Sequence, residues 1–303
     1  MSSMGPPDVL VIGDANPDLL LTGDVVPRFG QVEKLVDSAD LVLGGSAAIA
    51  ACGLARLGVP TALAAVVGDD LFGEFVRAEL TMAGVDTRWL RTDPGAATAL
   101  SVVLSAGDRA ILTLPGALAG TGADIVDTDL LSRVRHVHSA SMFLLPLLAP
   151  HLPEIFTAAR SGGATTSLDT NWDPAGLWLG ALELVEHSDV VFPNAAELLE
   201  MTHAADLDAA AATILALGCR VALKDGASGG VLWDGQTVSR VAAPSIDVVD
   251  TTGAGDSFDA GFISGMIEGL SGPTCLERAV RCGSLSTRSV GGIAAQARRA
   301  DLG

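Results

Sequence analysis

Short apolar runs alternate with longer amphipathic stretches along most of this 303-residue chain. The apolar runs have the length of buried strands, and the amphipathic stretches repeat with the period of a helix. Strands are predicted at 8–12, 61–67, 134–140, 165–168, 190–192, 220–223 and 230–233, and helices at 44–57, 71–83, 151–160, 195–201 and 208–217. Strands that alternate with helices of these lengths predict a parallel sheet covered by helices on both faces.

Two pairs of segments in the N-terminal half break this alternation. Residues 18–23 are predicted to pair with 39–43, and 98–104 with 110–114 across a loop that contains Gly107. Both pairs are expected to be antiparallel and to form a small sheet that projects from the main body. Such a sheet either covers a functional site and excludes water from it, or is an ordinary sheet extension. No linker rich in Pro, Gly or Ser divides the chain, so we expect one domain over residues 1–303.

The chain is strongly acidic, with 36 Asp and Glu against 18 Lys and Arg and a net charge of −18. This charge disfavours nucleic acids and anionic membranes as partners, because both are bound through Lys and Arg contacts with phosphate. Four cysteines without a CxxC spacing, and the lack of a membrane-length apolar segment or a signal-peptide pattern, predict a reduced cytoplasmic protein. His136 and His138 fall on one face of a predicted strand, where we favour a structural role over zinc binding.

A glycine-rich segment, Asp250-Thr-Thr-Gly-Ala-Gly-Asp256, separates the strand-like apolar run 246–249 from a stretch with helical period. Gly253 and Gly255 let the backbone curl so that successive N–H groups face one point at the positive end of that helix. Asp256 would repel a resting phosphate there, but it can take a proton from a hydroxyl group that attacks phosphorus. The segment therefore predicts phosphoryl transfer, although such a turn can also be only a tight connection. Neither of the two lysines lies in a GxxxxGK[ST] string, which excludes a P-loop.

The same segment, extended to Phe258, resembles the second signature of the ribokinase-like (PfkB) family of carbohydrate and nucleoside kinases. Further segments resemble other parts of the family pattern, in matching order: Gly13-Asp-Ala-Asn-Pro-Asp18, Gly44 to Gly58, Pro193-Asn-Ala-Ala-Glu197 and Lys224-Asp-Gly-Ala-Ser-Gly229. The resemblance implies a three-layer α/β/α ribokinase-like fold with a mainly parallel central sheet. It also implies a small β-sheet lid, formed by about residues 14–44 and 95–115.

The resemblance implies roles for individual residues as well. Asp256 would be the general base, and Gly253, Ala254 and Gly255 would form an anion hole for the transferred phosphoryl group. The substrate-binding residues would be Asn16, Asp18, Gly44, Gly45, Ser46 and Asp256. The nucleotide-binding residues would be Asn194, Lys224, Gly226, Gly229, Gly253 and Gly255.

Several of these side chains have a plainer alternative role. Asn16 and Asp18 can hydrogen-bond sugar hydroxyls, or they can cap a helix or turn. Asn194 and Glu197 can arrange Mg²⁺ through its waters, or they can form a capping box. Lys224 can meet a phosphate, or it can lie at an exposed strand end.

The implied cofactors are ATP and Mg²⁺, and the resemblance adds K⁺ as a further hypothesis. Asp250 and Thr252 match positions that help to bind a monovalent cation in many relatives. The loop 287–292 would supply carbonyl groups to that cation.

Two departures from the family pattern concern the substrate. Ile49 stands where sugar kinases of the family usually have Asn, and the segment 141–146 offers apolar side chains where ribokinases place a Glu. The loss of two polar contacts disfavours ribose itself, because a pocket built around a hydroxyl discriminates through those bonds. Phe143 and Leu144 either face a nucleobase or another apolar group, or belong to the core.

We therefore predict an ATP-dependent kinase that phosphorylates a primary hydroxyl of a sugar or sugar-like molecule. A nucleoside kinase of the same fold is one alternative, and a catalytically silent sugar- or nucleotide-binding regulator is another. The intact Asp256 and glycine loop argue against the regulator. Apolar residues on both faces of the predicted lid favour a homodimer formed through the lid.

Overall fold

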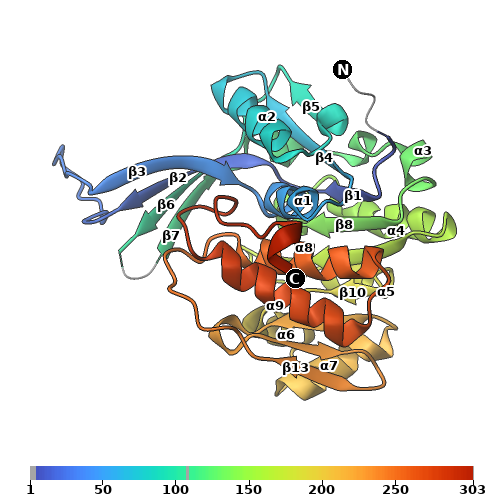
Figure 1. Cartoon of the computed structure of the whole chain (residues 1–303). Helices are drawn as coiled ribbons and strands as arrows, with labels where there is room; N and C mark the ends of the chain where they lie inside the picture. Colours follow the sequence, from blue (N-terminus) through green and yellow to red (C-terminus); the bar gives the residue numbers. More distant parts are fainter. Residues whose placement is uncertain (1–4, 107–108, 303) are drawn as a thin grey trace.

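The main body of the protein is built on one twisted, mostly parallel sheet (Figure 1). The computed structural model describes residues 5–106 and 109–302, and within them this sheet has nine strands in the order β13-β12-β11-β10-β9-β8-β1-β4-β5. The strands are β1 Val9–Ile12, β4 Thr61–Gly68, β5 Leu90–Asp93, β8 His136–Ala140, β9 Thr165–Asp169, β10 Val190–Val191, β11 Arg220–Lys224, β12 Gly230–Trp233 and β13 Val238–Val241. The strands from β11 to β5 are parallel, and β12 and β13 are antiparallel additions at one edge.

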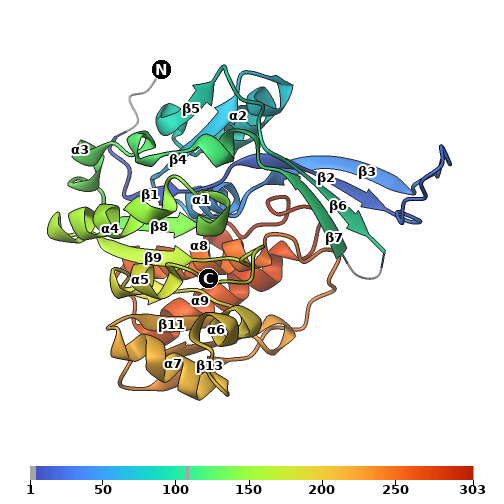
Figure 2. The ribbon, with the colours of Figure 1, turned by 180° about the vertical axis from the view of Figure 1, so that it is seen from behind.

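Helices cover both faces of this sheet, as Figures 1 and 2 show from opposite sides. One face carries α1 Ser46–Arg56, α2 Leu71–Ala83, α8 Ala254–Ile267 and α9 Gly272–Ser286. The other carries α3 Thr128–Leu131, α4 Leu152–Ser161, α5 Ala181–Glu186, α6 Ala195–Thr202 and α7 Leu207–Ala216. Helices cover both faces because both faces of the sheet are apolar. In strand β1, for example, Val9 and Val11 join one apolar core, and Leu10 and Ile12 join the other. The three-layer α/β/α prediction is confirmed.

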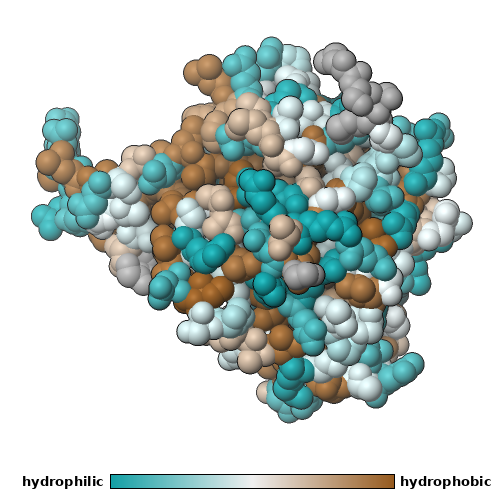
Figure 3. Space-filling model, in the orientation of Figure 1, coloured by the Kyte–Doolittle hydropathy of each residue, from teal (hydrophilic) through white to brown (hydrophobic). Residues whose placement is uncertain are grey.

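A second, four-stranded sheet extends from one end of the body (Figure 1). Its strands are β2 Asn16–Thr22, β3 Ser38–Gly44, β6 Leu100–Ser105 and β7 Arg109–Leu114, in the order β3-β2-β6-β7. The two predicted antiparallel pairs are present, and a parallel pairing of β2 with β6 joins them. Gly107, in the predicted hairpin loop, lies outside the described residues. On the face in Figure 3, apolar residues gather where this sheet joins the body. Leu41 of β3 is among the exposed apolar residues of the molecule.

The predicted strand at 246–249 is wrong. This segment runs between β13 and α8 without entering a sheet, and Val248 and Val249 are exposed. The backbone N–H groups of Val249 and Asp250 donate to the carbonyl of Thr287 instead. A strand-like apolar pattern yields a strand only where a sheet edge is free to pair with it, and here the segment connects the edge strand to a helix on the sheet face.

His136 and His138 are both buried on the same side of β8 and share the hydroxyl of Ser167 at 2.7 and 2.8 Å, which is a structural arrangement. The four cysteines are buried and free. None of the described helices combines the length and apolar character needed to cross a membrane.

Candidate active site

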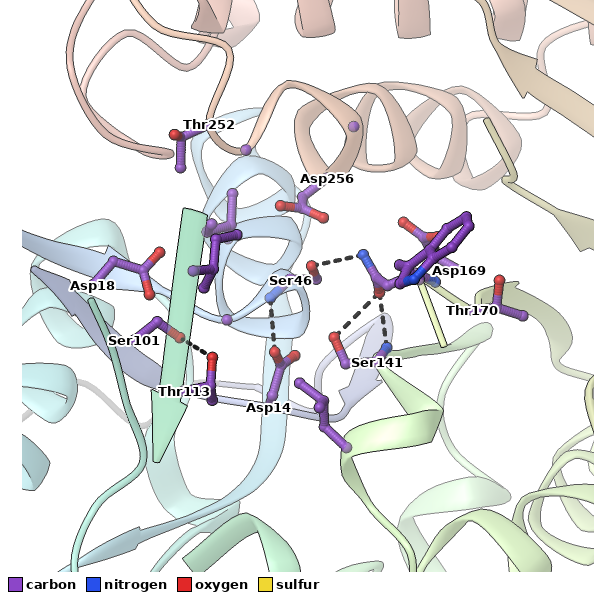
Figure 4. Close-up of a pocket in the computed structure, with 18 of the residues that line it drawn as sticks. Asp14, Asp18, Ser46, Ser101, Thr113, Ser141, Asp169, Thr170, Thr252 and Asp256 are labelled. Atoms are coloured by element: carbon purple, nitrogen blue, oxygen red, sulfur yellow. Dashed lines mark hydrogen bonds between the residues drawn. The ribbon is translucent and has the colours of Figure 1, made fainter. Parts of the chain in front are cut away.

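A cavity of about 870 Å³ opens between the small sheet and the carboxyl ends of the parallel strands. Polar residues that directly follow or end those strands line it: Asp14 after β1, Asp169 at the end of β9, Asn194 after β10 and Lys224 at the end of β11. Ligands of open α/β sheets bind at this edge, because polar loop ends converge there. Figure 4 shows Asp14, Asp18 and Asp256 pointing into the same space from different elements.

The glycine-rich loop meets this cavity at the N-terminus of α8. Gly253 is the N-cap residue and has a φ of +70°, in the left-handed region that favours glycine. A Cβ atom on Gly253 would lie 2.6 Å from the Cα atom of Gly292, so the loop is packed tightly against backbone. The first-turn N–H groups of a helix have no acceptor within it, and the helix dipole is positive there. Backbone N–H groups at such a helix start are able to bind an anion.

Asp256 lies in the first turn of α8 and is 7% exposed. Burial raises the pKa of its carboxyl to about 8, and the nearby carboxylates of Asp169 and Asp14 add to this rise. The ammonium group of Lys224 and a hydrogen bond with Ser46 act in the opposite direction. A carboxyl whose pKa lies near physiological pH has the acid–base strength that suits a general base.

The predicted substrate residues come together where β2 starts and β3 ends. Asn16 pairs with Gly44 across the two strands, and the Asn16 side chain donates to Oδ1 of Asp18 at 2.9 Å. A Cβ atom on Gly44 would lie 2.2 Å from the Asp18 carboxyl carbon, so any side chain here would displace that carboxyl group. Burial and the charge of Asp14 raise the pKa of Asp18 to about 7, although the Asn16 hydrogen bond opposes this.

Helix capping, the alternative role considered for Asn16 and Asp18, is performed by the neighbouring residue Asp14, which was not among the predicted site residues. Asp14 accepts hydrogen bonds from the N–H groups of Ser46 and Ala47, at 3.2 and 3.0 Å, and so caps α1. Gly45, with a φ of +83°, turns the chain between β3 and this helix. Asp18 takes no part in that cap, and it lines the large cavity.

A second group of residues was also missed. Asn171 donates from Nδ2 to the Ser46 hydroxyl at 2.9 Å, and its Oδ1 accepts from the N–H group of Ser141 at 2.9 Å (Figure 4). Asp169 accepts from the N–H group of Asn171. Polar residues directly after the predicted strand 165–168 were the available signal, because the ends of parallel strands meet at one edge.

Asn194 and Glu197 form the capping box that was the alternative to a metal role. Asn194 Oδ1 accepts from the N–H group of Glu197 at 2.9 Å, and the N–H group of Asn194 donates to Glu197 Oε2 at 2.8 Å. Burial raises the pKa of Glu197, while the charge of Lys224 lowers it. Both residues also line the large cavity, so capping and a function in the cavity are compatible.

Lys224 does not lie at an exposed strand end, so that alternative is wrong. Its side chain is 14% exposed, and its Nζ lies 2.6 Å from Oδ2 of Asp169. A second cavity of about 500 Å³ lies beside the first, between the turn at Gly226 and Gly229 and the start of α8. Lys224, Gly226 and Gly255 line both cavities, so the two spaces meet at the ammonium group and the glycine loop.

The segments expected at a monovalent cation site do lie together. Asp250 Oδ1 accepts from the N–H and hydroxyl groups of Thr252 at 2.9 and 2.8 Å. Asp250 Oδ2 accepts from the N–H group of Gly291 at 2.9 Å, which ties the glycine-rich segment to the loop 287–292.

One wall of the large cavity is apolar. Phe143 and Leu144 are half-buried and line it, so neither is purely a core residue. Phe143 packs edge-on against Trp178 at 5.5 Å, and Trp172, which is 52% exposed, lines the same cavity. Ile49 is buried and also borders the cavity.

Comparisons with known proteins agree with this geometry. The sequence profile described as "pfkB family carbohydrate kinase" matches residues 6–298. The chain is 29% identical to a ribokinase of Arabidopsis thaliana over 304 residues, which cover 95% of this chain and 78% of that protein. It is 30% identical to a fructoselysine 6-kinase of Escherichia coli K12 over 245 residues, which cover 79% of this chain and 87% of that protein.

The fold also matches a solved structure. The structure of Arabidopsis thaliana ribokinase complexed with ribose and ATP superposes with a TM-score of 0.87 at 25% identity. The superposition covers 98% of each chain. The ribokinase-like form of the three-layer fold is thereby confirmed.

Proposed function

Since the chain belongs to the pfkB family of carbohydrate kinases, we propose that it transfers the terminal phosphoryl group of ATP to a primary hydroxyl of a sugar or sugar-like acceptor. One observation carries this proposal: the glycine loop lies where two cavities meet, and Asp256, in the same helix turn, lines the larger of them. Relatives named ribokinase and fructoselysine 6-kinase, and a ribokinase structure with ribose and ATP, support a sugar as acceptor and ATP as donor.

The acceptor binds in the large cavity. Asn16 and Asp18 supply a donor and a carboxylate for vicinal hydroxyls, and Gly44, Gly45 and Ser46 allow close approach of the sugar. The four-stranded sheet belongs to a lid formed by about residues 14–44 and 95–115. This lid excludes water, so that the sugar hydroxyl rather than water attacks.

ATP binds in the second cavity with its phosphates toward α8. Gly226 and Gly229 shape the turn under the nucleotide; a Cβ atom on Gly229 would lie 2.0 Å from the carbonyl oxygen of Val241. The N–H groups of Gly253, Ala254 and Gly255 stabilise the charge that develops on the transferred group. Asp256 accepts the proton of the attacking hydroxyl as the new O–P bond forms and the bond to ADP breaks.

Mg²⁺ would neutralise charge on the phosphates of ATP when bound. The residues present fit this ion: Glu197 lines the cavity, and the capping box uses its Oε2. Its carboxylate can order the waters that Mg²⁺ usually keeps, while Asn194 holds the Glu197 side chain in place.

A monovalent cation beside the glycine loop is part of the proposal. Asp250 and Thr252 are joined to the loop 287–292 by hydrogen bonds, so a K⁺ ion bound there would hold the loop in its active form. Replacing Na⁺ by K⁺ at constant ionic strength is expected to raise kcat. Equal rates in the two salts would remove the cation from this proposal.

A homodimer formed through the small sheet is also proposed. Ile111, Leu112 and Leu114 of β7 are more than half exposed, which is unusual for apolar strand residues of a monomer. Sedimentation equilibrium is expected to give twice the monomer mass, and Leu112→Lys should shift the protein toward the monomer. A wild-type protein that is monomeric at micromolar concentration would contradict the dimer.

The proposed function is tested by coupled ADP release over a panel of sugars, sugar phosphates and nucleosides. A nucleoside kinase is the second candidate, because Phe143, Leu144 and Trp172 form an apolar wall that suits a base. Turnover of inosine, cytidine or adenosine above that of ribose, fructose and fructosamines would favour it. If no acceptor stimulates ADP release, the protein is a binding regulator instead.

A further inference from the structure

A buried cluster of charged groups lies behind the first turn of α8. Lys224 Nζ is 2.6 Å from Oδ2 of Asp169 and 3.8 Å from Oδ1 of Asp259. One carboxylate oxygen each from Asp169, Asp256 and Asp259 lie within 4.8 Å of one another. Asp259 is fully buried, and its two oxygens have no hydrogen-bond partner among the described residues. The ammonium group of Lys224 therefore lies in a buried cluster of carboxyl groups, and its charge also acts on the buried carboxyl of Glu197.

The position of Lys224 is tightly defined. Its side chain runs along the glycine loop, since a Cβ atom on Gly255 would lie 3.3 Å from both Cδ and Nζ of Lys224. On the other side, Asp169 accepts from the N–H group of Asn171, whose side chain donates to Ser46. Contacts thus run without a break from the glycine loop to the start of α1, on the acceptor side of the cavity.

The charges around Asp256 come from several elements. Asp14 lies after β1, Asp169 ends β9, Lys224 ends β11, and Asp259 is one turn further along α8. Asp169 and Asp14 disfavour the ionised form of Asp256, and Lys224 favours it. Burial of the cluster makes each of these charges more effective than it would be in water.

Two arginines of the helices that pack against α8 have partners away from Asp256, although Arg278 also donates to the Ser264 hydroxyl on α8 at 3.3 Å. Arg56 of α1 donates to the carbonyl of Ile293, and Arg278 of α9 pairs with Glu268 beyond the far end of α8. Among the causes that act on the pKa of Asp256, the positive charge of Lys224 is the one that lowers it most.

We propose that Lys224 and Asp169 are positioning residues of the transfer reaction, which together hold Asp256 in place and set its charge state. In this proposal the ammonium group acts through the carboxyl cluster, in which Asp169 binds it at 2.6 Å and Asp259 lies 3.8 Å from it, rather than as a ligand of the transferred phosphoryl group. The proposal rests on the proposed function only in naming Asp256 as the base. It gives Lys224 a different role from the phosphate contact expected from the sequence.

The test follows the ionisation of Asp256 directly, by carbon-13 NMR of protein labelled at the Asp carboxyl carbons. The Asp256 signal is identified by its absence in Asp256→Asn. Its midpoint in the wild type is expected near the pKa of about 8 that burial produces. Lys224→Met should move the midpoint upward by about one pH unit or more, since an attractive charge is lost. Asp169→Asn should move it downward, since a repulsive charge is lost.

The double variant Lys224→Met/Asp169→Asn keeps the shapes of both side chains without a buried unpaired charge, and its midpoint should return toward the wild-type value. If Lys224→Met does not fold, the double variant and Asp169→Asn are compared with the wild type instead, and the two should still differ in the midpoint of Asp256. Arg133→Met, a surface change of the same kind, should leave the midpoint unmoved. Midpoints that agree in all variants, or that move the same way in both single variants, would overturn the proposal.

Kinetics and nucleotide titration separate this proposal from the proposed function. The pH at which kcat/KM rises should follow the NMR midpoints, while the affinity for a non-hydrolysable ATP analogue changes less than threefold in Lys224→Met. A loss of analogue affinity above tenfold with an unmoved midpoint would make Lys224 a phosphate ligand. If the Asp256 midpoint moves in opposite directions in Lys224→Met and Asp169→Asn while the protein phosphorylates no acceptor, that result would uphold this inference and refute the proposed kinase function.

Discussion

Asp256→Asn is expected to lower kcat by about 10²- to 10⁴-fold, the usual contribution of a general base. Asn has nearly the same shape as Asp but cannot accept the proton of the attacking hydroxyl. The affinity for an ATP analogue, measured by calorimetry, should change little, because the glycine loop keeps its backbone. Asp247→Asn is the matched control, since Asp247 is exposed in the segment that leads to the same loop. An Asp256→Asn enzyme with more than a tenth of the wild-type kcat would remove Asp256 from its role.

The same variant should not lose stability. Burial raises the pKa of Asp256 from 3.8 to about 8 in the folded protein, so the folded state binds its proton more tightly than the unfolded state. That stabilisation is fully present at pH values below 3.8 and is lost as the pH rises toward 8. A neutral Asn does not have this pH-dependent loss. At pH 8, thermal unfolding of Asp256→Asn should therefore occur no lower than that of the wild type.

Gly253→Ala is expected to lower kcat/KM by about 10²- to 10³-fold, the loss seen when one donor of an anion hole is removed. The new Cβ atom would lie 2.6 Å from Cα and 2.9 Å from the carbonyl oxygen of Gly292, which are backbone atoms that cannot rotate away. Ile49 closes the third side at 3.0 Å. The glycine loop must then shift, and its N–H groups leave the position of the transferred phosphoryl group.

Gly269→Ala separates this shift from backbone strain. Gly269 has a φ of +74°, close to that of Gly253, but no atom lies within 4 Å of its would-be Cβ atom. Both variants should lose about 1–2 kcal/mol of folding stability, measured by thermal unfolding, because Ala disfavours the left-handed conformation. Only Gly253→Ala should also lose turnover, measured as kcat/KM for the acceptor. Equal turnover in the two variants would show that the loop has no catalytic role.

Local patterns predicted most of the body correctly. The helix predicted at 71–83 has these bounds in the structure, where Asp70 caps its start and Gly84 ends it with a φ of +88°. Such signals act within a few residues, so they do not depend on the rest of the fold. The helix α9 was not predicted, although Ser271 before Pro273 was a start signal for it.

The site was predicted only in part, because only some of its residues are close together along the chain. Asp256 and the glycine loop are contiguous in the chain, so their chemistry can be inferred from spacing alone. Asp169 and Lys224 are 55 residues apart, and their ion pair exists because β9 and β11 flank β10 in the sheet. No periodicity encodes that neighbourhood. The burial of Lys224 and the cap formed by Asp14 were missed for the same reason.

The sequence by itself determined the layers of the body, the two hairpins of the small sheet and the glycine loop at a helix start, because each depends on residues that are close along the chain. The tertiary structure alone decided which carboxyl groups surround Asp256, which cation balances them, and that the apolar run 246–249 pairs with no strand. Strand order and burial set those outcomes, and both are properties of the whole packed molecule.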